Sequence, residues 1–60
     1  MKALATALRS ESSVQVRLEM VRLLGGLKAT DEVAAVLLRD VADNDASDEV
    51  RRLAASLLAG

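Results

Sequence analysis

The sequence lacks several residue types on which small proteins depend for stability and for chemistry. Its 60 residues include no cysteine and no histidine, so neither a disulfide nor a histidine-bound metal can stabilise the fold. It also has no phenylalanine, tyrosine or tryptophan, so any core must be built from leucine, valine, alanine and methionine. A domain of this size hides only roughly 60% of the surface that its unfolded chain exposes, and its stability is therefore marginal.

These absences also restrict the chemistry that the chain can perform. The usual general base, the nucleophilic thiol and the phenolic acid are all missing, which leaves only a carboxylate pair or a serine–lysine pair. A chain this short cannot enclose a pocket that would activate either pair. We therefore expect no enzymatic activity and no cofactor.

The charge balance and the hydropathy pattern exclude two classes of partner. The net charge is −1, and no aromatic side chain is present to stack on bases, so we expect no binding to nucleic acid. The apolar run from Ala3 to Leu8 is interrupted by Arg9, which makes it too short for a signal peptide. No stretch approaches the length needed to span a membrane. We therefore expect a cytoplasmic protein that binds no membrane.

What remains is rich in residues that favour helices. The chain is 52% apolar, contains no proline, and spaces its apolar residues in a helical rather than an alternating pattern. The pattern predicts a single all-α domain over residues 1–60, with four short helices. They are expected from about Lys2 to Arg9, with Leu4 on the apolar face, from about Val14 to Leu24, from Asp31 to the turn at Asn44, and from Asp48 onwards.

Capping residues place the ends of these helices. The expected N-caps of the second, third and fourth helices are Ser13, Thr30 and Ser47, with a capping box of Ser12 and Gln15 as the alternative for the second. The pair Gly25-Gly26 is expected to end the second helix. The links are short, so sequential helices should form antiparallel hairpins.

The two halves of the chain repeat each other at a displacement of 34 residues. Ser13 then aligns with Ser47, Val16-Arg17 with Val50-Arg51, Leu23-Leu24 with Leu57-Leu58, and Gly26 with Gly60. A fixed period of this size indicates stacked helical repeats, here a first repeat over residues 1–26 and a second over residues 31–60. The signature residues of tetratricopeptide and ankyrin repeats are absent.

The segment from Asp45 to Ala54 resembles the HEAT or HEAT-like (PBS-lyase-type) repeat. In that family an acidic turn residue precedes a Val-Arg pair at the start of the second helix, and the segment from Glu11 to Arg17 has the same register. The chain departs from the family in its short period and in a truncated first helix. The resemblance implies a right-handed stack of two helical hairpins, a fragment of an α-solenoid, that offers interaction surfaces and has no chemistry of its own.

Two arginines fall on the apolar side of their expected helices. A buried charge requires a partner, and the family resemblance implies that Arg17 and Arg51 form a ladder with acidic turn residues of neighbouring repeats. The pair we expect is Arg17 with Asp45. These residues, together with Val16 and Val50 at core positions, are given a structural role in preference to ligand binding.

A second pattern in the same turn is weaker. Asp43, Asp45 and Ser47 match the first, third and fifth positions of a calcium-binding loop. Asp48 stands where that loop requires glycine, and Ala54 stands where it requires glutamate. Turn formation and helix capping explain these residues, and no metal site is expected.

The outward stripe of the second helix in each hairpin is the expected partner-binding surface. Its residues are Gln15, Leu18, Glu19, Arg22, Glu49, Arg52, Leu53 and Ser56. Leu18 and Leu53 would form a small apolar centre with a charged rim, which is the usual anatomy of a binding site.

The function favoured by these patterns is a non-catalytic protein-interaction or scaffolding module. Its partner would be another protein, a second copy in a homo-oligomer, or further repeats of a longer chain. Two alternatives remain open. The chain could be an accessory HEAT-like fragment of a larger enzyme, similar to those in bilin lyases or DNA-repair glycosylases, or a small self-assembling structural protein.

Overall fold

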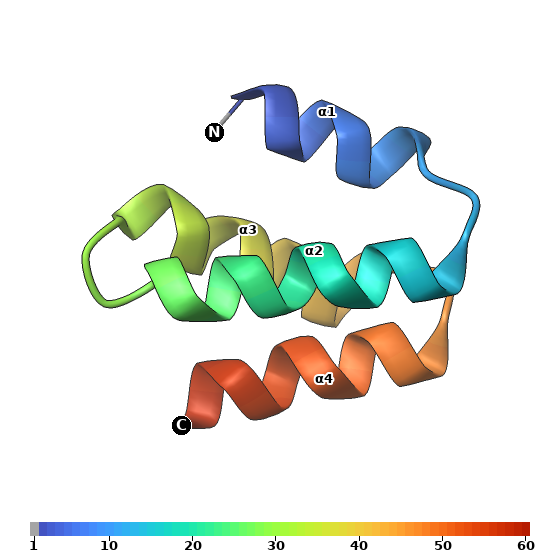
Figure 1. The fold of residues 1–60 in the computed structure, drawn as a ribbon. Helices are drawn as coiled ribbons and strands as arrows, with labels where there is room; N and C mark the ends of the chain where they lie inside the picture. The colour runs from blue at the N-terminus through green and yellow to red at the C-terminus, as the bar shows by residue number, and fades with distance from the viewer. Residues whose placement is uncertain (1) are drawn as a thin grey trace.

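The computed structural model describes residues 2–60, apart from the side chains of Lys2 and Leu4, and folds them into four helices (Figure 1). These are α1 (Lys2–Ser10), α2 (Val14–Leu27), α3 (Glu32–Asn44) and α4 (Asp48–Ala59). The all-α prediction is confirmed for these residues, whereas the expected place of Leu4 on an apolar face lies outside the described side chains. None of the four helices is both long enough and apolar enough to cross a membrane.

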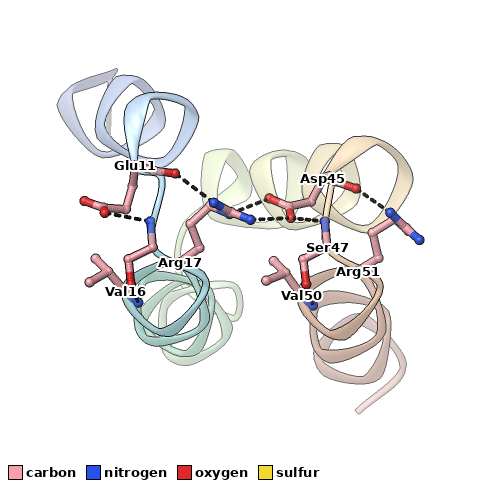
Figure 2. A network of polar contacts seen from close by, with 8 residues as sticks. Glu11, Val16, Arg17, Asp45, Ser47, Val50 and Arg51 are labelled. Carbon is pink, nitrogen blue, oxygen red and sulfur yellow. Dashed lines mark hydrogen bonds and ion pairs between the residues drawn. The ribbon is translucent and has the colours of Figure 1, made fainter.

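The helices form two antiparallel hairpins that lie side by side. In Figure 2, α1 and α3 form one layer and α2 and α4 form the other. The most extensive contact is between α3 and α4, and α2 packs against both of them. α1 makes fewer contacts, mainly with α2, so the second hairpin is the more tightly packed of the two.

One aliphatic core is shared by both hairpins. Its buried side chains are Leu8, Leu18, Val21, Leu24, Ala34, Leu38, Val41, Val50 and Ala54. The four largest that are fully buried, Val21, Leu24, Leu38 and Val50, come equally from the two hairpins. Burying a side chain of this size contributes roughly 1.5–3 kcal/mol, so each hairpin depends on the other for much of its stability.

The N-caps follow the predictions at two helices and differ at the third. The Ser13 hydroxyl accepts the amide of Val16, and the Ser47 hydroxyl accepts the amide of Val50, as predicted. The predicted cap Thr30 is wrong, because Asp31 caps α3 through a 2.9 Å hydrogen bond from the Val33 amide. The Thr30 hydroxyl instead donates to the carbonyl of Leu27 at the end of α2. Aspartate caps as well as serine and better than threonine, so the turn is one residue longer than expected.

The prediction that Gly25-Gly26 ends α2 is wrong. The helix continues to Leu27, and no described glycine adopts a positive φ. A Cβ atom on Gly25 would lie 2.9 Å from both methyl carbons of Leu57, whereas a Cβ on Gly26 would meet nothing within 4 Å. Gly25 is therefore where α4 approaches the backbone of α2, and it is not a helix terminator.

Candidate functional site: the contact between the hairpins

Arg17, in the first turns of α2, extends to the turn that precedes α4. Its Nε lies 3.1 Å from Oδ1 of Asp45, and its Nη2 donates to Oδ2 at 3.4 Å. The Nε contact has the distance of an ion pair but not the direction of a hydrogen bond, so Nη2 makes the directional contact. The two side chains are 12% and 10% exposed. The predicted pairing of Arg17 with Asp45 is confirmed.

The same arginine also binds the turn of its own hairpin. Its Nη1 donates to the carbonyl oxygen of Glu11 at 2.8 Å. Asp45 has two roles as well, because its Oδ2 accepts the amide of Ser47 at 2.9 Å. One guanidinium and one carboxylate therefore join the turn before α2 to the turn before α4.

Most of this arrangement occurs twice, as Figure 2 shows. The Glu11 carboxylate accepts the amide of Ser13 at 2.9 Å, as Asp45 does for Ser47. Nη1 of Arg51 donates to the carbonyl of Asp45 at 2.6 Å, as Arg17 does to Glu11. Residues 34 positions apart thus hold their turns in the same way.

The ion pair between hairpins does not recur at the outer ends. Nη2 of Arg51 contacts Asp48 of its own helix at 3.1 Å. No arginine or lysine side chain among those the structure describes lies within ion-pair distance of Glu11. Glu11 and Arg51 therefore carry opposite charges at opposite ends of the molecule (Figure 2).

The two valines of the Val-Arg pairs differ in burial. Val50 is fully buried, as predicted, and lies on the side of α4 that faces α2 (Figure 2). Val16 is 37% exposed, so its predicted place in the core is wrong. It lies on the side of α2 that faces away from the second hairpin, where nothing in the described chain covers it.

The predicted partner-binding stripe lies mostly on the surface, but its apolar centre does not. The polar members Gln15, Glu19, Arg22, Glu49, Arg52 and Ser56 are exposed. Leu18 is only 4% exposed and belongs to the core, and Leu53 is half-buried against the core. The expected exposed pair of leucines is therefore corrected, because α2 turns Leu18 towards the interior with Val21. Binding by the stripe stays a prediction.

Two contacts between the hairpins were not expected from the sequence. Nζ of Lys28, in the link after α2, donates to the carbonyl of Leu57 near the end of α4. It supplies a partner to one of the last carbonyls, which no amide within the helix can reach. The approach of Leu57 to Gly25 is the second contact. Both join residues about thirty positions apart, and neither follows a local pattern.

Two hollows lie beside the contact. One, of about 240 Å³, separates α1 from α3, and the long ion pair of Arg9 with Asp40 lies at its edge. The other, of about 500 Å³, lies on the outer side of the second hairpin and is lined in part by Val36, Arg39 and Leu58. Both are open to solvent, and no three acidic side chains in residues 2–60 are placed to hold a metal ion.

The polar contact between the hairpins is therefore the most specific arrangement in the described chain. It joins two helical units and presents no group poised for a reaction. Comparison of the chain with protein families, with curated proteins and with solved structures found no match.

Proposed function

We propose that the protein is a non-catalytic scaffolding module, a short stack of HEAT-like hairpins that binds other proteins. The observation that carries this proposal is the buried pairing of Arg17 with Asp45. It joins equivalent turns of two hairpins that bear the same caps and the same arginine-to-carbonyl hydrogen bonds. A contact of this kind is a rule for adding units, as in an α-solenoid.

The shared core supports the same proposal. In a stack of repeats, each unit buries its apolar side against its neighbours and contacts no others. Val21 and Leu24 of α2 are fully buried together with Leu38 and Val50 of the second hairpin. The hairpins are therefore stabilised by stacking on each other.

The exposed stripe of α2 and α4 supplies a surface for a protein partner. Glu19, Arg22, Glu49 and Arg52 alternate in sign along this side, which suits a partner with a mixed polar surface. Arg52 is 81% exposed and pairs with Asp48 in its own helix, so a partner would have to compete with that ion pair.

Extending the stack tests the proposed architecture. A further copy of residues 27–60 appended after Gly60 should fold onto α4, since Arg51 would then meet the copied Asp45. We expect the helical signal per residue to be maintained and the unfolding midpoint to rise above that of the parent.

The matched control carries the same appended hairpin with its copied Val50 replaced by aspartate, which prevents docking because it would bury a charge. This chain should melt like the parent and add an unfolded segment. If the intact and the control extensions behave alike, the hairpins are not stacking units and the proposal fails.

A self-assembling structural protein is the second candidate. It is favoured by the exposure of Val16 and Leu23, whose counterparts 34 residues later are covered or half-covered within the molecule. This candidate uses the same stacking contact, directed outward.

A further inference from the structure

The residues that join the two hairpins have counterparts on both outer ends of the molecule. Within the molecule, Arg17, Val21 and Leu24 of the first hairpin lie at the contact with the second, which contributes Asp45, Val50 and Leu57. Displacement by 34 residues defines two outer faces. The outgoing face consists of Arg51, Ala55 and Leu58, and the incoming face consists of Glu11, Val16 and Leu23.

Burial separates the inner residues from their outer counterparts. Val21 and Leu24 are fully buried, whereas Ala55 is exposed and Leu58 is half-buried. Val50 is fully buried, whereas Val16 is 37% exposed. Leu57 is half-buried against Gly25, whereas Leu23 is 62% exposed. Both outer faces therefore carry apolar side chains of the kind that the inner contact covers.

The charges of the two faces are complementary. Glu11 holds the Ser13 amide with the same geometry with which Asp45 holds Ser47. Arg51 keeps the hydrogen bond to its own turn, and its Nη2 contacts the 60% exposed side chain of Asp48. The groups that would form a second ion pair between hairpins are thus already held in place on opposite edges (Figure 2).

We propose that the occupant of each outer face is a second copy of this chain, stacked head to tail. Arg51 of one copy pairs with Glu11 of the next, as Arg17 pairs with Asp45, and the outgoing face covers Val16 and Leu23. This proposal rests on the proposed function and names the partner. A contact between two different faces does not close on itself as a twofold dimer does, so the assembly grows into rings or open chains.

Two departures from the inner contact make the outer one weaker. Ala59 stands where the inner contact has Gly25, so its methyl group approaches Leu23, which is exposed and free to change rotamer. Arg39 stands where α1 has Ala5, and the hollow of about 500 Å³ around it leaves room for its side chain. The association is therefore reversible and depends on concentration.

Steric blocking of the outgoing face tests the proposal. Ala55→Arg adds a large side chain to that face, and Ser56→Arg adds the same side chain to the neighbouring exposed position of α4, outside the face. Both positions are exposed, so both variants should keep the helical signal and the melting temperature of the parent. Sedimentation equilibrium from micromolar to millimolar concentration should show mass rising for the parent and for Ser56→Arg. For Ala55→Arg the dissociation constant should rise about tenfold or more.

Removing the charge of the incoming face gives an independent test. Glu11→Gln retains an oxygen for the Ser13 amide but loses the ion pair, and Glu19→Gln makes the same change outside the face. Only Glu11→Gln should weaken association, and the weakening should lessen at high salt because screening also reduces the parent's pairing.

A parent chain that stays monomeric at millimolar concentration would overturn the proposal, as would equal masses for Ala55→Arg and Ser56→Arg. A symmetric dimer that is insensitive to both pairs of variants would overturn it too. If the appended hairpin stabilises the chain while the parent stays monomeric, self-stacking is wrong and the scaffold proposal stands. If the appended hairpin also fails to dock, both are wrong.

Discussion

At the scale of single residues, the Asp45 carboxylate serves two hairpins at once. It accepts a backbone amide of its own turn and pairs with Arg17 of the preceding hairpin. This contact was predictable because the acidic turn residue and the Val-Arg pair form a motif at a fixed spacing. The outward direction of Arg51 and the exposure of Val16 were not predictable, since they depend on which neighbour is present.

The two arginines should contribute unequally to stability. Arg17→Ala leaves a carboxylate that is 10% exposed without its cation, and we expect a loss of about 1–3 kcal/mol in the free energy of unfolding. Arg51 is 36% exposed and pairs with an exposed aspartate, so Arg51→Ala should cost less than about 1 kcal/mol. Urea unfolding of both variants measures the difference. Equal losses would show that the pairing between hairpins has no special weight.

At the scale of helices, the sequence predicted the number and the type of the elements but not all of their ends. Helical spacing and the serine caps sufficed to place most of α1, α2 and α4. Gly25 misled because glycine is usual after a helix, whereas here it admits Leu57 from another helix. Leu18 misled because the helical wheel shows which residues share a side but not which side meets the core. Both errors concern tertiary contacts, which a local pattern does not contain.

The adjacent glycines of α2 provide a matched test of that explanation. Glycine inside a helix is less favourable than alanine by roughly 0.5–1 kcal/mol, and Gly26 has open space around it. Gly26→Ala should therefore raise the free energy of unfolding by about that amount. Gly25→Ala should gain less or lose stability, because Leu57 must move.

The measurement is thermal or urea unfolding of the two single variants, each repeated in a Leu57→Ala background. There the new methyl group of Gly25→Ala meets no obstruction, and the two substitutions should have similar effects. If Gly25→Ala stabilises the parent as much as Gly26→Ala does, the close approach of α4 to α2 is absent.

At the scale of the whole molecule, the two hairpins share one core and expose the edges of the same contact. A chain of 60 residues without disulfides has little stability to spare, so covering these edges would have a large effect on it. Because association stabilises only the folded chain, we expect the melting temperature to rise with protein concentration.

Disulfide trapping between two copies tests outward stacking most directly. Inside the molecule, a Cβ atom on Gly25 would lie 3.2 Å from Cγ of Leu57, which places the two backbones within reach of a disulfide, whose Cβ atoms lie roughly 3.5–4.5 Å apart. The outer counterparts of these positions are Ala59 and Leu23, both exposed. The chain has no cysteine of its own. Leu23→Cys and Ala59→Cys, made in separate chains, therefore report only contact between copies.

When the two variants are mixed and oxidised, the account predicts that the mixed disulfide forms faster than either symmetric dimer. Its yield should fall when Ala55→Arg is added to the Ala59→Cys chain and should be unchanged when Ser56→Arg is added instead. A statistical mixture of mixed and symmetric dimers, unaffected by either arginine, would contradict head-to-tail stacking.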